Sequence, residues 1–161
     1  MKLKKISFLF LLVMIGCNTP TQFSDSSLQE KFTNTNLEEQ TFESILSKHS
    51  GKKILINIWA SWCRDCIVGL PHFKKLQQEN PEVVFVNLSL DKSLVKWKQA
   101  LDRYQIRADH YYLSQGKKGD FGKFINLWWI PRYMVVNETG DIILYKATKI
   151  TDKKIVEALK N

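Results

Sequence analysis

Short apolar runs and amphipathic segments alternate along most of this chain. Five runs rich in β-branched and aromatic residues predict strands, at 54–60, 82–90, 109–114, 132–137 and 141–147. The run at 54–60 (ILINIWA) is almost wholly apolar, which is typical of a central strand buried on both faces. The last two runs flank ETG, where Gly140 supplies the positive φ of a tight hairpin turn.

Between these runs, apolar residues recur every three or four positions, which predicts amphipathic helices. The predicted helices are 37–50, which Gly51 stops, 64–80, 92–106, 119–127 and 151–161, with Thr151 as the cap. The apolar stripes are Leu94, Val95, Trp97 and Leu101 in one helix, and Ile155, Val156 and Leu159 in the last. The alternation, closed by a hairpin, predicts an α/β domain whose central mixed β-sheet has helices on both faces.

The first residues have a different pattern, typical of an export signal. Residues 1–5 (MKLKK) are basic, and residues 6–15 (ISFLFLLVMI) form an apolar run that is short for a transmembrane span. The run ends in MIGC, which resembles the lipobox of bacterial lipoproteins, with Met14 where Leu is commoner. We therefore expect a lipoprotein signal peptide at 1–16 and a lipidated Cys17. A plain secretory signal cleaved nearby and an uncleaved anchor are the alternatives.

The residues after this signal fall into two segments that differ in amino-acid composition. Residues 18–36 are dominated by Ser, Thr, Asn and Gln, so we expect a lipidated cysteine and flexible tether at 17–36 and a folded domain at 37–161. Hydrophobic residues make up 44% of the chain, which suits a domain with a core. The net charge is +8, of which residues 1–5 contribute three. The other basic residues are scattered without a nucleic-acid motif, so no nucleic-acid partner is expected.

Two cysteines, Cys63 and Cys66, lie where the central strand passes into a helix. Residues three apart in a first helical turn share a face, close enough for a disulfide, which persists in exported proteins. The free amide groups and the dipole of the helix stabilise a thiolate there. We predict that Cys63, nearer the helix end, is the exposed nucleophile and that the more buried Cys66 resolves the mixed disulfide. Arg64 favours the thiolate and Asp65 opposes it.

Three other roles are possible for a cysteine pair: a zinc site, a copper site and a purely structural disulfide. A closed zinc site needs four ligands, and the histidines of the chain are scattered, at His49, His72 and His110. Copper could bind the pair with His72 or His110, but the spacing gives no support. A purely structural disulfide would close too short a loop to remove much unfolded-state entropy. Redox catalysis fits the pattern best, and no metal or organic cofactor is expected.

Residues 56–66 (INIWASWCRDC) resemble the active-site segment of thioredoxin-fold proteins, with their Trp-Cys-x-x-Cys signature. Pro71 matches the proline that kinks the family's active-site helix. Residues 128–147 (WWIPRYMVVNETGDIILYKA) resemble the family's cis-proline strand and final hairpin. The resemblance covers nearly all of 37–161 and implies a thioredoxin-like fold.

Within this superfamily, the chain is most similar to the membrane-tethered, exported TlpA/ResA-like branch. Asn57 stands where thioredoxin has a buried aspartate, and 87–106 resembles the branch's Asp-rich turn and following helix. The chain departs from the family where Gly69 replaces a common glutamate and Arg64-Asp65 replaces Gly-Pro. Neither usual buried carboxylate is present, so the sequence does not identify the group that carries protons to Cys66.

The resemblance also implies a substrate-binding surface opposite the cysteines. Pro131 is expected to follow a cis peptide bond, and the backbone of Ile130 to pair with substrate as an added strand. A trans proline that begins an ordinary strand is the alternative. Trp62 and Trp129 are expected to present flat apolar surfaces to a partner. Core packing is expected for two further tryptophans, Trp59 and Trp128.

The family resemblance implies an extracytoplasmic thiol–disulfide oxidoreductase that acts on protein disulfides or dithiols. It favours a lipid-anchored reductant recharged by a membrane-bound electron donor, as in cytochrome c maturation. A thiol peroxidase is one alternative, but Ile56 and Ala60 replace the Pro and Thr/Ser of the peroxidase pattern before Cys63. A copper carrier or a redox-inert binding lipoprotein is the other.

Lipidation of Cys17 is directly testable. The variant Cys17→Ala is expected to lose all incorporation of a labelled fatty acid in cells, because the acceptor thiol of the lipobox-like MIGC is gone. Labelling that persists in the variant would refute the lipoprotein hypothesis.

Overall fold

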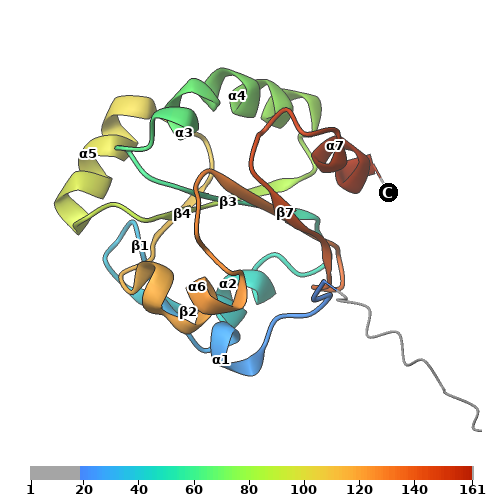
Figure 1. The fold of residues 1–161 in the computed structure, drawn as a ribbon, viewed down its shortest axis with the longest axis horizontal. Coiled ribbons are helices and arrows are strands. Elements are labelled where there is room, and N and C mark those ends of the chain that lie inside the picture. The colour runs from blue at the N-terminus through green and yellow to red at the C-terminus, as the bar shows by residue number, and fades with distance from the viewer. Residues whose placement is uncertain (1–18, 161) are drawn as a thin grey trace, which may run out of the picture.

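A seven-stranded mixed sheet forms the centre of the protein in the computed structural model, which describes residues 19–160 (Figure 1). The strands are β1 (Lys31–Asn34), β2 (Glu39–Thr41), β3 (Ile54–Trp59), β4 (Val84–Ser89), β5 (Asp109–Tyr112), β6 (Arg132–Val136) and β7 (Ile142–Ala147). They lie in the order β2-β1-β5-β4-β3-β6-β7. The central strands β3, β4 and β5 are parallel, and the other neighbouring pairs are antiparallel.

Helices cover both faces of this sheet. They are α1 (Asp25–Leu28), α2 (Phe42–Ser47), α3 (Arg64–Val68), α4 (Leu70–Glu79), α5 (Leu94–Tyr104), the 3₁₀ helix η1 (Gly116–Lys118), α6 (Asp120–Phe124) and α7 (Lys153–Lys160). Figure 1 shows α3, α4 and α7 on one side of the sheet and α1, α2 and α6 on the other. The predicted α/β fold, a mixed sheet with helices on both faces, is confirmed.

The parallel arrangement brings three connections to one edge of the sheet. Every residue of β3 is buried, as its unbroken apolar run predicted. Its carboxyl end lies beside those of β4 and β5, because the three strands run in the same direction. The antiparallel strand β6 begins at this same edge. The segments that follow β3, β4 and β5 and the segment that precedes β6 therefore meet there.

The flexible tether predicted over 17–36 is wrong for the described part of that segment. Ser24 caps α1, and β1 pairs with both β2 and β5. The cause is a cluster of aromatic rings, whose neighbouring centroids lie 4.7–6.3 Å apart, formed by Phe23, Phe32, Phe42, Phe121 and Phe124. Two isolated phenylalanines in a polar segment are too weak a pattern to predict this order. Cys17 and the expected signal peptide at 1–16 lie outside the described residues.

Helix boundaries differ from the predictions where a side chain caps the backbone. The helix expected from Leu37 begins only at Phe42, because the Thr41 hydroxyl accepts a hydrogen bond from the N–H of Ser44 at 3.2 Å. The last helix is capped by Asp152, whose carboxylate accepts from the N–H of Lys154 at 3.0 Å, and not by Thr151. Two residues assigned to apolar stripes are exposed, Val95 and Val156.

A buried carboxylate from the N-terminal segment fixes α6. Glu30 accepts a hydrogen bond from the backbone N–H of Phe121, in the first turn of that helix. Gly119 leaves the necessary space, because a Cβ there would lie 2.1 Å from a Glu30 carboxylate oxygen. Burial raises the pKa of Glu30, although the hydrogen bond from Phe121 opposes this effect.

This carboxylate makes stability depend on pH. Because the pKa of Glu30 is raised in the folded state, its contribution is most favourable below the unfolded pKa and is lost as the pH rises through the folded pKa. The variant Glu30→Gln, which keeps an acceptor without the charge, is expected to raise Tm at about pH 8 and to lose that advantage at about pH 4. Thermal unfolding across this range measures the difference.

The control is Glu30→Ala, which removes the acceptor as well. It is expected to destabilise the fold by about 1 kcal/mol even at low pH, since the N–H of Phe121 then lacks its partner. A Tm difference between wild type and Glu30→Gln that does not change with pH would contradict this account.

Candidate active site

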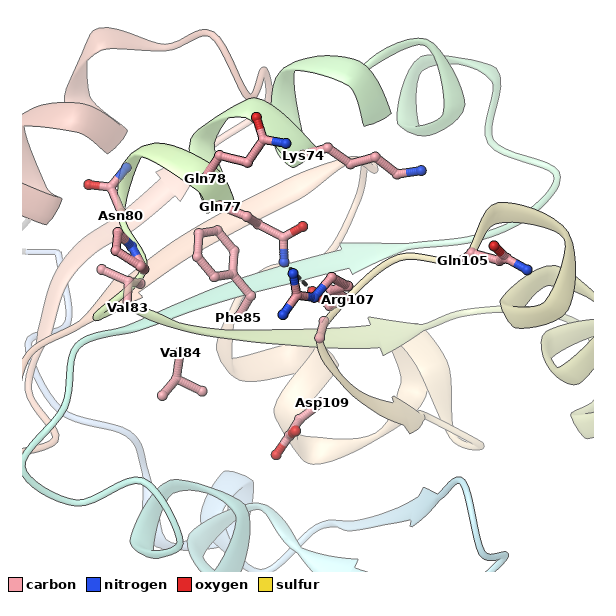
Figure 2. Close-up of a pocket in the computed structure, with 12 residues that line it drawn as sticks. Lys74, Gln77, Gln78, Asn80, Val83, Val84, Phe85, Gln105, Arg107 and Asp109 are labelled. Carbon is pink, nitrogen blue, oxygen red and sulfur yellow. Dashed lines mark hydrogen bonds between the residues drawn. The ribbon is translucent and has the colours of Figure 1, made fainter.

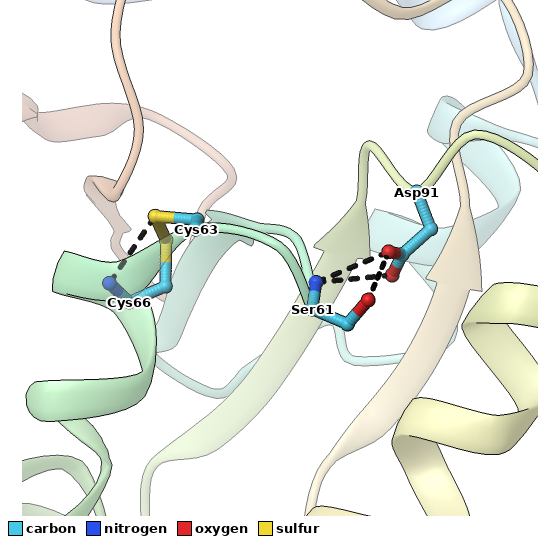
Figure 3. The surroundings of a disulfide bond; sticks show 4 residues. All are labelled: Ser61, Cys63, Cys66 and Asp91. Carbon is cyan, nitrogen blue, oxygen red and sulfur yellow. Dashed lines mark hydrogen bonds between the residues drawn. A yellow bond between two sulfur atoms is a disulfide. The ribbon is translucent and has the colours of Figure 1, made fainter.

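The two cysteines lie at the junction of β3 and α3. Cys63 is the N-cap of α3, and Cys66 follows in its first turn. They form a disulfide with a Cα–Cα distance of 5.3 Å, and the N–H of Cys66 points at the sulfur of Cys63 at 3.2 Å (Figure 3). This amide and the helix dipole are positioned to stabilise a thiolate on Cys63 once the disulfide opens.

Cys63 is less exposed than the sequence predicted. Cys63 is only 6% exposed and Cys66 is 3% exposed, so neither thiol projects freely into solvent. Cys63 lines a surface hollow, however, whereas Cys66 does not. The surrounding side chains therefore cover most of Cys63, the predicted nucleophile, which a partner can approach from the hollow.

A buried carboxylate fixes the turn that precedes Cys63. Asp91, which follows β4 and is 4% exposed, accepts hydrogen bonds from the backbone N–H of Ser61 at 3.1 Å and from its hydroxyl at 2.6 Å (Figure 3). It also accepts from the hydroxyl of Ser89 at 2.8 Å. These bonds satisfy a charge that would otherwise be costly to bury. They hold the backbone from which Trp62 and Cys63 project.

Sequence reasoning missed Asp91, although a signal for it was present. The residue comes directly after a buried strand that is parallel to β3. Because the carboxyl ends of parallel strands share an edge, a polar residue there is a candidate neighbour of Cys63. No single segment carries this signal, since it requires the pairing of β3 with β4.

The hollow in front of Cys63 has a volume of about 350 Å³ and brings together residues from three segments. It is lined by Trp62, Cys63, Arg64, Asp65, Lys117, Trp128, Trp129 and Ile130. Trp62, Trp129 and Ile130 were predicted to lie beside the cysteines, and the structure places them there. Lys117 and Trp128 were missed.

Trp128 corrects the sequence interpretation most clearly. It was expected in the core but is 77% exposed, whereas Trp59, expected in the core as well, is buried. Trp59 belongs to the central strand, while Trp128 lies in the irregular connection between α6 and β6. An apolar residue outside regular structure has no periodicity that could show which way it faces.

The segment that follows Trp128 leads into β6. The peptide bond between Ile130 and Pro131 is cis, and both side chains are largely buried. Ile130 contributes to the hollow, whereas Pro131 is not among its lining residues. Ile130 thus forms part of the wall of the hollow that contains Cys63.

The side chains of Arg132 and Tyr145 stabilise the segment that carries this wall. The guanidinium of the buried Arg132 donates a hydrogen bond to the carbonyl of Ile125 at 2.7 Å, and the hydroxyl of Tyr145 donates to the carbonyl of Phe124 at 2.6 Å. Arg132 also lies over the Tyr145 ring, 5.2 Å from its centroid. Burial lowers the pKa of Arg132. The pair anchors the end of α6, from which the Trp128 segment departs.

Neither of the two positions where the family commonly carries a buried carboxylate, Asn57 and Gly69, has one in this chain. Asn57 is buried in β3 and donates to the side-chain oxygen of Asn87 at 3.1 Å. His110 lies opposite Asn87 on the neighbouring strand β5, and burial lowers its pKa. At Gly69, a Cβ would lie 3.5 Å from the Ile150 side chain, which occupies the space beside the helix.

A larger cavity than the one at Cys63 lies at the opposite edge of the sheet (Figure 2). Its volume is about 680 Å³, and it lies where α4 ends and where β4 and β5 begin. Lys74 donates a hydrogen bond to the carbonyl of Tyr104, and Gln77 donates to that of Arg107. These bonds fasten α4 to the connection between α5 and β5, so the Lys74 and Gln77 side chains of the cavity already have structural partners.

Within residues 19–160, no three or more His, Cys, Asp or Glu side chains are grouped so that they could hold a metal ion. None of the helices in this range has the length and apolar character needed to span a membrane.

Comparison with known proteins places this geometry in a family. The chain matches the Redoxin family over residues 23–159. It is 30% identical over 121 residues to the thioredoxin-like protein YneN of Bacillus subtilis, which covers 73% of this chain and 69% of that protein. It is 26% identical over 137 residues to the thiol:disulfide interchange protein DsbE of Haemophilus influenzae, with 83% and 68% covered.

A solved structure agrees with these relatives. A Bacteroides vulgatus protein provisionally classed as a thiol–disulfide oxidoreductase superposes with a TM-score of 0.70 at 25% identity, over 86% of this chain and 88% of that one. The thioredoxin-like fold and the oxidoreductase class predicted from the Trp-Cys-x-x-Cys segment are confirmed. The chain therefore belongs to the Redoxin family and is one of its thioredoxin-fold thiol–disulfide oxidoreductases.

Proposed function

We propose that this protein reduces disulfide bonds of exported proteins outside the cytoplasm, with Cys63 and Cys66 as its redox pair. One observation carries the proposal: the Cys63–Cys66 disulfide opens through Cys63 onto a hollow walled by Trp62 and the Trp128–Ile130 segment. A polypeptide can therefore reach Cys63, while Cys66 stays behind it. This asymmetry is what a nucleophile and a resolving thiol require.

The reaction begins from the reduced dithiol. The Cys63 thiolate attacks one sulfur of a substrate disulfide, forming a mixed disulfide and releasing the other substrate sulfur as a thiolate, which takes a proton from water. Deprotonated Cys66 then attacks the sulfur of Cys63. This second step forms the Cys63–Cys66 disulfide seen in the structure and releases the second substrate thiolate. The substrate gains two electrons and the dithiol loses two.

No metal or organic cofactor enters these steps, so the two electrons must be restored by a dithiol donor. A membrane-bound electron donor fits this need, since the proposed compartment lies outside the reducing cytoplasm. Cytochrome c maturation is one process that consumes reduced thiols in such a compartment. The DsbE relative, a thiol:disulfide interchange protein by name, supports an exchange role of this kind.

The proposed anchor would set the orientation of the active site. The carbonyl of Thr21 accepts a hydrogen bond from the N–H of Ile142, at the start of β7, and Thr21 lies four residues after Cys17 in the sequence. Four residues span at most about 14 Å, which would keep the domain close to the membrane. This start of β7 lies at the sheet edge opposite the cysteines (Figure 1). Lipidation at Cys17 would therefore turn the hollow away from the lipid surface.

The roles of the two cysteines are testable by trapping. In cells, Cys66→Ser is expected to accumulate mixed disulfides between Cys63 and its partners, because the resolving thiol is missing. Cys63→Ser is expected to form none and to reduce substrates only at the background rate. Non-reducing electrophoresis followed by identification of the captured proteins measures both. Each substitution replaces a nearly buried sulfur by oxygen, so the two variants are matched controls for stability. Equal trapping by both would refute the assigned roles.

The direction of electron flow is testable by equilibrium with thiol–disulfide buffers. A reductant of this kind is expected to have a reduction potential near or below about −250 mV, close to that of thioredoxin. Arg64 and Asp65 between the cysteines carry opposite charges, which supports a value nearer thioredoxin's than that of a strong oxidant. A potential near about −120 mV would show that the protein donates disulfides and would overturn the reductase proposal.

A further inference from the structure

A second hollow adjoins the one that contains Cys63. Its volume is about 280 Å³, and it is lined by Lys117, Gly122, Lys123, Asn126, Leu127 and Trp128. Two of these residues, Lys117 and Trp128, also line the hollow in front of Cys63. The two hollows are therefore neighbours, and together they form one groove that Trp128 divides. We call the part without the cysteine the lysine hollow.

Trp128, which divides the groove, has an exposed side chain, but hydrogen bonds restrain its backbone. The N–H of Trp128 donates a hydrogen bond to the carbonyl of Asn126 at 3.0 Å, and its own carbonyl accepts from the ammonium of Lys117 at 3.1 Å. Trp62 and Trp129 are exposed beside it. Large apolar side chains grouped at a surface and rimmed by polar groups mark a binding site. Because hydrogen bonds already restrain the backbone of Trp128, this segment loses less conformational entropy when a polypeptide binds to it.

The lysine hollow is positively charged. Two of its six lining residues are lysines, and none is a carboxylate. Asp120 pairs with Lys123 at 3.4 Å, but both side chains are mostly exposed, so this pair is weak and can open. In the hollow with the cysteine, by contrast, Arg64 is offset by Asp65.

The packing of η1 against α6 keeps both lysines at this hollow. A Cβ on Gly122 would lie 2.3 Å from the carbonyl oxygen of Gly116, so only glycine allows the two elements to approach so closely. Lys117 belongs to η1 and Lys123 to α6. Their ammonium groups therefore come from two elements whose separation is set by backbone contact.

We infer that this groove selects polypeptide substrates with an aromatic or large aliphatic residue beside the reacting cysteine and an acidic residue within a few positions of it. The apolar residue packs against Trp62, Trp128 and Trp129 while the cysteine meets Cys63. The acidic side chain then reaches past Trp128 to Lys117 and Lys123. This inference rests on the disulfide reductase function proposed above and names its substrate class.

Two matched synthetic peptides test the inference. Both contain one internal disulfide with a phenylalanine beside a cysteine, and they differ only in two flanking residues, which are Glu in one peptide and Lys in the other. The reduced full-length protein is mixed with each, and the second-order rate constant of disulfide reduction is measured. The acidic peptide is expected to react about threefold to tenfold faster at low salt, and the ratio is expected to fall as salt is added.

Lysine variants locate the source of this preference. The double variant Lys117→Gln/Lys123→Gln is expected to bring the ratio of the two rates close to one. Lys123→Gln alone, which leaves the bond from Lys117 to the Trp128 carbonyl intact, is expected to lower the ratio part of the way. The control Lys118→Gln/Lys146→Gln removes the same net charge at residues outside both hollows, and it is expected to keep the wild-type ratio.

A tryptophan variant and a small neutral disulfide separate this inference from the proposed function. For Trp128→Ala, the peptide rates are expected to fall about tenfold relative to the rate with 2-hydroxyethyl disulfide, which is too small to span the groove. Wild-type protein that reduces 2-hydroxyethyl disulfide but shows equal peptide rates, or a ratio that survives the double lysine substitution, would overturn the inference alone. Failure to reduce the small disulfide would overturn the reductase function, and the inference would fall with it.

Discussion

The buried carboxylate of Asp91 joins the two strand ends on which the active site is built. It binds Ser89 at the end of β4 and Ser61 just after β3, so the strand pairing of the sheet extends into the turn that carries Cys63. A buried charge is stable only while its partners surround it, which makes the arrangement intolerant of displacement. The position of Trp62 and of the disulfide follows from this contact.

The opposite wall of the groove depends on α6, a helix of only five residues. So short a helix is marginal by itself, and the structure stabilises both of its ends. Glu30 satisfies its first turn, and Arg132 and Tyr145 bind the carbonyls at its last. The N-terminal segment therefore contributes to the active site indirectly, because it stabilises the helix from which the Trp128 segment extends.

Both cysteines belong to the buried apolar core, and neither Asn57 nor Gly69 supplies the carboxylate that the family commonly carries there. Asn57 and Asn87 form a hydrogen-bonded pair across β3 and β4, and Gly69 leaves its position to the side chain of Ile150. Neutral amides do not bind and release protons near neutral pH, so this pair cannot carry protons as a carboxylate would.

Local patterns in the sequence determined five of the seven strands, most helices, the final hairpin and the redox chemistry of the Cys63–Cys66 pair, but not β1 and β2. These features depend on neighbouring residues: an unbroken apolar run specifies β3, and a three-residue separation in a helical turn specifies a disulfide. Tertiary structure alone decided the order of the N-terminal segment, the exposure of Trp128 and the roles of Asp91 and Lys117. Each of these follows from contacts between segments far apart in the chain, whose partners are set by strand order in the sheet. A single isolated residue carries no periodicity, so the sequence does not show which way its side chain points. Its direction and its partners are fixed only when the parallel strands bring their ends to one edge of the sheet.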